Sequence, residues 1–211
     1  MDKISLYNAL ITSKVVVSVH VVVSIESFKE TPKTLTIHSK ATLRLNLFVI
    51  LDDAQYTKEN FQNRNKFLNK NGVEEYFTVE LEQGANKKLI KDVLVNNKTK
   101  WRSKILTKLQ TNFKVDLSDI YKYDKLIDIN LASINYCREK LGINTPMVLS
   151  SELNITTTRS QRLADICKHF NATEYISGGG GKAYLDESIF NCKVSYFHPD
   201  VPNYYTTLQH I

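Results

Sequence analysis

The sequence predicts an α/β protein whose sheet is mostly parallel and flanked by helices. Three observations indicate this fold class. The short apolar run at residues 46–51 is typical of a strand that is buried on both faces. Residues 100–113 and 127–141 place apolar side chains along one helical face. In the last third, strand-like and helix-like segments alternate, which predicts right-handed crossovers and a C-terminal βαβαβ unit.

The elements before residue 145 differ in the clarity of their patterns. The first 45 residues are rich in Val, Ser and Thr and have no helical period, and the Val-rich stretch at 15–25 predicts a strand. Alternating residues at 75–82 predict another strand, and 89–95 is a further candidate. The helix at 100–113 follows from fourfold spacing of Trp101, Ile105, Leu109 and Phe113. The helix at 127–141 follows from Leu131, Ile134 and Leu141, with Gly142 as its C-cap.

The last third has the clearest punctuation. Predicted strands at 146–150, 174–177 and 194–197 alternate with a helix that begins at Thr158 or Ser160 and runs to about residue 170, a glycine loop at 178–181 and a short helix at 184–190. Ligands of such sheets bind beyond the carboxyl ends of the strands. This rule selects the loops after Leu51, Leu149 and Ser177.

Size and composition exclude several classes of protein. The 211 residues suffice for one domain, or one domain with an appendage, and 42% hydrophobic and 24% charged residues exclude a disordered chain. The three widely spaced cysteines fit neither a disulfide framework nor a zinc site. They favour a reducing, cytoplasmic location. The run at 15–25 is too short for a membrane span and lacks the cleavage site of a signal peptide.

The formal net charge is +6, and the basic excess lies in the middle of the sequence. Such an excess can attract phosphates, nucleotide sugars or nucleic acid, or it can be a solvated helix face. We expect a phosphorylated small molecule rather than nucleic acid as the partner. A nucleic-acid ligand would bind with steeply salt-dependent affinity.

The first candidate site follows the strand at 46–51. Its carboxylates are Asp52 and Asp53, of which Asp53 would act as a base or hold a divalent metal, with Lys58 as a second catalytic candidate. The substrate-binding candidates are Gln55, Tyr56, Asn63, Arg64 and Asn65, because amides and a guanidinium grip phosphate or carboxylate. The alternative is that the two aspartates cap a turn and pair with Lys58 or Arg64.

The second candidate site is a glycine loop. Its substrate-binding residues are Ser177, Gly178, Gly180, Gly181, Lys182 and Tyr184, since successive glycines let backbone N–H groups converge on an anion. The loop is neither a Walker A nor a GxGxxG motif, and the alternative is a flexible turn.

The third candidate site is Ser150, Ser151 and Glu152, whose hydroxyls and carboxylate can bind a sugar or ribose, or can cap the next segment. There is no G-x-S-x-G elbow, so a serine hydrolase is not expected. The histidines form no i, i+4 pair, so the sequence does not support a zinc hydrolase and assigns no residue as a metal ligand by this pattern. His198, after the last strand, is the only histidine considered as a residue near a site. No cofactor is identified.

These motifs together resemble the WbqC-like family over about residues 46–205. The matching stretches are Phe48 to Lys58 (Phe-Val-Ile-Leu-Asp-Asp-Ala-Gln-Tyr-Thr-Lys), Asn63-Arg64-Asn65, Trp101, Leu141 to Ile143, Ser150 to Leu153, Arg162-Leu163, Ile166-Cys167 and Ser177 to Asp186. Members of the family are often encoded beside genes for surface polysaccharides such as O-antigen. The resemblance implies a transferase that acts on an activated sugar or acyl donor.

The N-terminus departs from the family. Its opening segment, of the form Gln-Pro-x-Tyr-x-Pro-x-x-Gly-Tyr-Phe, has no match in residues 1–45, and Phe61 stands where the family has Trp. We therefore divide the chain into a divergent segment, 1–45, and a WbqC-like α/β domain, 46–211. Five residues are expected to face the glycine loop and Lys182, namely Asp53, Gln55, Lys58, Asn63 and Arg64. Arg64 and Lys182 would hold the donor phosphates. The alternative is an inactive relative that binds a nucleotide sugar or a partner without turnover.

Overall fold

The computed structural model describes residues 20–25, 45–58, 60–197, 206 and 208. They form two compact units. The hairpin unit contains residues 52–144 with 206 and 208, and the sheet unit contains 20–25, 45–51 and 145–197. The sequence suggested a different division, into residues 1–45 and 46–211. That division describes where the chain departs from a family pattern, and it stays a prediction.

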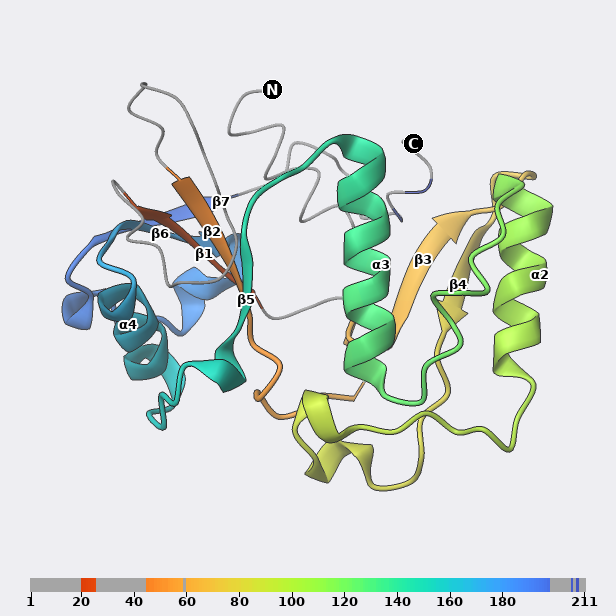
Figure 1. Cartoon of the computed structure of the whole chain (residues 1–211), viewed down its shortest axis with the longest axis horizontal. Helices are drawn as coiled ribbons and strands as arrows, with labels where there is room; N and C mark the ends of the chain where they lie inside the picture. The colour runs from red at the N-terminus through yellow and green to blue at the C-terminus, as the bar shows by residue number, and fades with distance from the viewer. Residues whose placement is uncertain (1–19, 26–44, 59, 198–205, 207, 209–211) are drawn as a thin grey trace. The chain divides into compact units, whose positions relative to one another are not determined.

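The sheet unit contains a five-stranded sheet (Figure 1). Its strand order is β5 (Met147–Leu149), β2 (Leu45–Ile50), β1 (His20–Ile25), β6 (Ala172–Gly178) and β7 (Lys193–Phe197). Strand β2 is parallel to β5, and β6 is parallel to β7, whereas β1 is antiparallel to both of its neighbours. Strands β2, β5, β6 and β7 therefore all run in one direction. The predicted α/β fold with a mostly parallel sheet is confirmed.

The apolar run of β2 is buried as predicted, because Leu47, Phe48, Val49 and Ile50 are each at most 3% exposed. Helix α4 (Arg159–His169) packs along β6 and buries Leu163, Ile166 and Cys167. Its bounds agree with the predicted helix. The β5–α4–β6 crossover and the strands that the sequence predicted in this region are confirmed.

Short 3₁₀ turns replace two predicted segments of the sheet unit. The predicted glycine loop is the turn η4 (Gly179–Ala183), and η3 (Ser150–Glu152) follows β5. The predicted helix at 184–190 is wrong, since only η5 (Glu187–Ile189) forms there. The carboxylate of Asp186 accepts from the N–H of Ser188 and starts a single turn. The turn ends at Phe190, whose backbone is extended with a φ of −83° and a ψ of 134°, and whose ring stacks on Tyr175 with centroids 5.2 Å apart.

Strand β1 lies at the centre of the sheet. It covers residues 20–25 of the strand predicted at 15–25, and residues 15–19 lie outside the described part of the chain. Val22 pairs with Phe48 of β2 and with Ile176 of β6. The divergent N-terminal segment thus supplies the strand that joins the two parallel pairs.

The hairpin unit is built on an antiparallel pair, β3 (Arg64–Leu68) and β4 (Glu74–Thr78). Helices α2 (Trp101–Phe113) and α3 (Leu126–Leu141) agree with the predicted helices, and α2 lies beside β4 (Figure 1). Gly142 has a φ of 64° and caps α3 as predicted, and its N–H bonds back to Arg138 and Glu139. None of the helices in the described residues is long and apolar enough to span a membrane.

Two strand predictions in this unit need correction. The strand at 75–82 ends at Thr78, and residues 89–95 contain the turn η2 (Ile90–Asp92) instead of a strand. Residues 79–82 and 89–95 form only isolated β-bridges, such as that of Leu81 with Val95, because the turn η2 interrupts the extended backbone that a continuous ladder needs. The first 3₁₀ turn of the unit, η1 (Ala85–Lys87), precedes it.

Aromatic side chains form the core between the hairpin and α2. Phe67 of β3 stacks on Phe77 of β4 with ring centroids 4.2 Å apart, and Phe113 of α2 meets the Phe67 ring edge-on at 5.6 Å. Trp101 packs edge-on against Tyr121, at 6.2 Å, and both are about 1% exposed. This core fixes one face of β3, so the opposite face, which includes Arg64, is available for a site.

Candidate functional site

A cavity of about 480 Å³ lies in the hairpin unit. This volume is within the range of pockets that bind small molecules, roughly 300–1,000 Å³. Three parts of the unit line it. They are the loop before β3, the start of β3 with the facing end of β4, and the loop that leads into η1. The lining residues are Tyr56, Lys58, Asn63, Arg64, Thr78, Leu81, Glu82, Gln83, Gly84, Ala85 and Asn86.

The first wall is the segment after β2. Its backbone runs along residues 86–91: the N–H of Lys91 donates to Asp52, that of Ile90 to Ala54, and that of Tyr56 to Lys88, at 2.8, 2.9 and 3.0 Å. Asp52 is 2% exposed. The buried aspartate and these bonds fix the course of the chain up to Tyr56.

A buried glutamine holds the turn that follows. The Oε1 of Gln62 accepts from the N–H of Thr57 at 2.8 Å, and the side chain is 2% exposed. The carbonyl of Gln62 in turn accepts from the Nδ2 of Asn130 on α3. Helix α3 thereby anchors the loop that carries Lys58.

Tyr56 and Asn63 form the floor of the cavity. The Tyr56 hydroxyl donates to Asn63 Oδ1 at 2.9 Å, and Asn63 Nδ2 donates to the carbonyl of Val79 at 2.9 Å. The N–H of Val79 returns a bond of 2.8 Å to the carbonyl of Asn63. Burial raises the pKa of Tyr56, and the nearby Arg64 guanidinium opposes that rise. The phenol is therefore a neutral donor at neutral pH.

Arg64 opens β3 and pairs with Thr78 of β4 across the hairpin. Its guanidinium carbon lies 5.4 Å from the centroid of the Tyr76 ring, which is 40% exposed. A guanidinium over an aromatic face is held in one orientation and keeps N–H donors at its edge. Arg64 is thus a preorganised cation at the cavity wall.

The remaining wall is the loop from Leu81 to Asn86. The N–H of Glu82 donates to Leu94 at 3.0 Å, and Leu81 forms its bridge with Val95. Gly84 has a φ of 80°, in the left-handed region that glycine adopts without strain, and it starts η1. Lys58 and Arg64 therefore face a cavity that also holds the carboxylate Glu82.

Four of the side chains predicted for the first site, Tyr56, Lys58, Asn63 and Arg64, line the cavity. Three others do not. Gln55 donates to the carbonyl of Asn86 at 2.9 Å, Asn65 is fully buried on the opposite face of β3, and Asp53 is half-buried outside the lining. Among the described residues, no group of three or more His, Cys, Asp or Glu is placed to hold a metal ion.

Sequence reasoning missed Thr78, Glu82, Gln83 and Asn86. Thr78 and Glu82 were expected inside a longer strand at 75–82, and Gln83 and Asn86 lie in a loop with no motif of its own. The one signal was Gly84, which follows the polar pair Glu82-Gln83 and marks a turn directly after an alternating strand.

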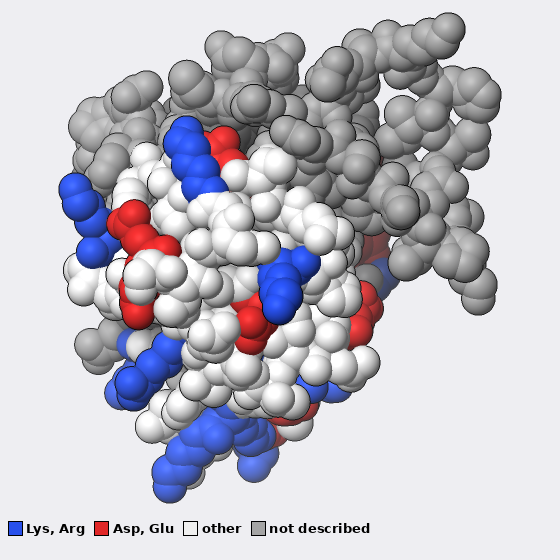
Figure 2. All heavy atoms as spheres, turned by 90° about the vertical axis from the view of Figure 1, so that its left-hand side faces the viewer, with Lys and Arg blue, Asp and Glu red and all other residues white. Residues whose placement is uncertain are grey.

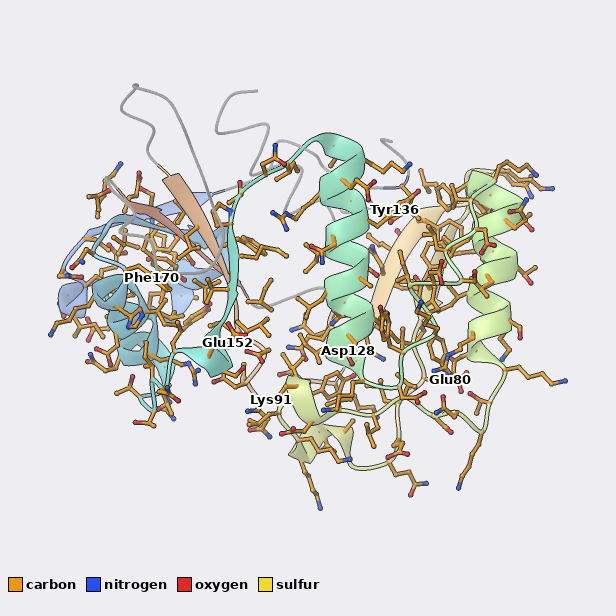
Figure 3. The ribbon with its side chains drawn as sticks, in the orientation of Figure 1. Glu80, Lys91, Asp128, Tyr136, Glu152 and Phe170 are labelled. Carbon is orange, nitrogen blue, oxygen red and sulfur yellow. The ribbon has the colours of Figure 1, made fainter. Side chains whose placement is uncertain are left out.

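The other predicted sites lie in the sheet unit. Ser150 to Glu152 follow β5, and Ser177 to Lys182 end β6, so both leave the same, carboxyl edge of the sheet. Ser150 and Ser177 are buried, Ser151 is half-buried, and Glu152 (Figure 3), Gly178, Gly180 and Lys182 are exposed. Because these residues and the cavity belong to different units, the expectation that they share one ligand stays a prediction.

Within the glycine loop, sterics explain why residue 181 is a glycine. A Cβ at this position would collide with the Oγ of Ser177, and it would approach Leu185 to 3.1 Å. Gly178 and Gly180 would meet nothing within 4 Å. The loop is tied to α4 by Ser160, whose Oγ accepts from the N–H of Asp186 at 3.1 Å. Tyr184 is 69% exposed beside it.

The cysteines are free thiols, as predicted. Cys137 and Cys167 are fully buried, and burial raises the pKa of Cys137 to about 12 and that of Cys167 further. Buried thiols with raised pKa values are poor nucleophiles. They are packing residues of their helices.

Comparison with known proteins gives a family and one relative. The model of the WbqC-like protein family matches residues 40–210. The chain is 28% identical over 169 residues, 72% of each chain, to a protein of Mycobacterium tuberculosis (strain ATCC 25618 / H37Rv) that is named the uncharacterized protein Rv1507c. No solved structure matches the chain.

Proposed function

Since the chain belongs to the WbqC-like protein family, we propose that it is a cytoplasmic transferase of bacterial surface-polysaccharide (O-antigen) biosynthesis. It takes an activated sugar or acyl donor and binds the donor through its phosphate groups. The free cysteines support a reducing compartment.

One observation carries the proposal: Lys58 and Arg64 line the same cavity. A guanidinium grips phosphate through paired N–H donors, and an ammonium adds a second positive charge. The cavity of about 480 Å³ has room for a sugar phosphate or for the phosphate end of a larger donor. Tyr56 and Thr78 add hydroxyl groups to the lining of the cavity.

Other roles in the proposed reaction are assigned to residues outside the cavity. Asp53 acts as the base, and Ser151, Glu152 and Lys182 at the carboxyl edge of the sheet bind the rest of the substrates. Ligands of parallel sheets bind at this edge, which supports the assignment.

The alternative function is a binding module without turnover, favoured by the N-terminal segment that departs from the family pattern. The central position of β1 supports the enzyme instead, because that segment completes the sheet. Release of nucleotide or coenzyme from a bound donor in the presence of acceptor distinguishes the two, since a module binds the donor and leaves it intact.

Nucleic-acid binding has less support. On the face of the sheet unit that Figure 2 shows, Lys and Arg are interspersed with Asp and Glu and with uncharged residues. In the basic middle of the sequence, which belongs to the hairpin unit, Arg102 pairs with Asp124 at 3.2 Å and Lys108 pairs with Glu75 at 2.9 Å. A nucleic-acid site would track the backbone with a continuous basic groove.

The test is ligand binding to the full chain, followed by thermal shift and calorimetry. The probes are inorganic pyrophosphate, UDP-glucose and acetyl-CoA. A ligand specific for the folded state raises the melting temperature by mass action. Arg64→Ala and Lys58→Ala should each weaken binding about tenfold or more, since a hydrogen bond to a charged group contributes roughly 1.5–3 kcal/mol.

Lys87→Ala is the matched control, because Lys87 is an exposed lysine of η1 that does not line the cavity. It should bind the probes as the unmodified chain does. Binding that is unchanged in Arg64→Ala and Lys58→Ala would remove the cavity from the proposal.

A further inference from the structure

Opposite charges line the cavity of the hairpin unit. Lys58 and Arg64 are its cations, and Glu82 is the one carboxylate among its lining residues. Neither the Lys58 ammonium nor the Glu82 carboxylate has a hydrogen-bond or ion-pair partner within the described part of the chain. The two groups are therefore available to a ligand.

The backbone at Glu82 is fixed from both sides. Its N–H donates to the carbonyl of Leu94 at 3.0 Å, the preceding Leu81 bridges to Val95, and Gly84 turns the chain two residues later. Glu82 thus stays at the cavity while its side chain remains exposed. A carboxylate on a fixed segment of backbone, in a cavity that two cations also line, favours ligands that carry both signs of charge.

We infer that Glu82 selects, within the donor class of the proposed function, a sugar phosphate that also carries a free amino group. Lys58 and Arg64 hold the phosphate, and Glu82 holds the ammonium. This inference rests on the proposed function only for the phosphate end of the ligand. The amino end of the ligand is assigned to Glu82, which lies outside the stretches that match the family.

The hydroxyl groups of a neutral sugar compete for the same carboxylate. A hydroxyl donates one neutral hydrogen bond, whereas an ammonium adds its charge, and charge-assisted bonds are about twice as strong. Glucosamine 1-phosphate and glucose 1-phosphate differ only at this group, so they are the matched probes.

The experiment is calorimetric titration of the full chain with both sugar phosphates. The unmodified chain should bind glucosamine 1-phosphate about tenfold more tightly than glucose 1-phosphate. In Glu82→Gln, which keeps the shape and removes the charge, the ratio should fall to about one. Glu80→Gln is the control, because Glu80 lies on the same segment after β4 (Figure 3) and does not line the cavity.

Equal affinities for the two probes in the unmodified chain, or a ratio that Glu82→Gln leaves unchanged, would overturn the role of Glu82. If the role of Glu82 fails but Arg64→Ala still abolishes binding of both probes, the proposed function stands without a role for Glu82. Failure of both probes and of pyrophosphate to bind would overturn the two together.

Discussion

The hydroxyl group of Tyr56 donates a 2.9 Å hydrogen bond to Asn63 across the floor of the cavity. Asn63 in turn donates to Val79, at the end of the hairpin. One amide therefore joins the loop after β2, the start of β3 and the segment after β4. The shape of the cavity depends on this amide.

Asn63→Ala should lower the free energy of unfolding by about 1–3 kcal/mol, because it leaves the buried Tyr56 hydroxyl and the Val79 carbonyl without their partner. Urea denaturation measures the loss. Asn86→Ala is the control, since the side chain of this exposed cavity residue has no hydrogen bond within the described residues. Equal stabilities of the two variants would show that the amide does not organise the floor.

Gly181→Ala should destabilise the sheet unit by about 1–3 kcal/mol, the usual cost of forcing extra atoms into a packed site. The cause is specific, because the new methyl group would collide with the Oγ of Ser177. The double variant Ser177→Ala, Gly181→Ala should recover part of the loss. Gly180→Ala, where a Cβ would meet nothing within 4 Å, is the control. A loss as large at Gly180 as at Gly181 would contradict the steric account.

Asp165 should make the stability of the protein depend on pH. Its carboxylate accepts from Thr157 Oγ1 at 2.6 Å and from Gln161 Nε2 at 2.9 Å, and these bonds hold its pKa below the ordinary value of 3.8. A depressed pKa stabilises the folded state above that value, and the stabilisation is lost as the pH falls through the folded-state pKa.

Asp165→Asn should therefore be less stable than the unmodified chain at about pH 7, and the two should converge as the pH falls below the ordinary carboxyl pKa of 3.8 and through the lower folded-state pKa. Chemical denaturation at several pH values measures the difference. Thr157→Val, which removes the first of the two bonds, should show a smaller effect of the same sign. A difference that is independent of pH would mean that Asp165 acts through packing alone.

Arg64→Lys tests the geometry of the proposed anion site as distinct from its charge. A lysine keeps the positive charge but loses the planar guanidinium that lies over the Tyr76 ring and its paired donors. Pyrophosphate affinity should fall about tenfold at low salt. Unchanged affinity in calorimetry would show that charge alone binds the anion.

The sequence predicted the three long helices well, because Trp101, Ile105 and Leu109 all face one core and are buried. It missed β3, whose buried positions are filled by Asn65 and Phe67 and whose other face carries Arg64. Because a polar residue, Asn65, fills one of its two buried positions, the strand lacks the apolar alternation that would have predicted it. Four lining residues of the cavity, Tyr56, Lys58, Asn63 and Arg64, were predicted because they are close in sequence. Glu82 was missed because it reaches the cavity only through the hairpin and the bridge of Leu81 with Val95.

Strand β1 has a consequence for how the molecule is made. Val22 needs Phe48, which is synthesised soon after it, and also Ile176, which is synthesised far later. The sheet therefore closes only when most of the chain has left the ribosome, and pairing of such distant segments slows folding. Until β6 arrives, one edge of β1 offers unpaired backbone groups to other strands. The yield of folded protein should then depend on whether this edge of β1 is protected from other strands during synthesis.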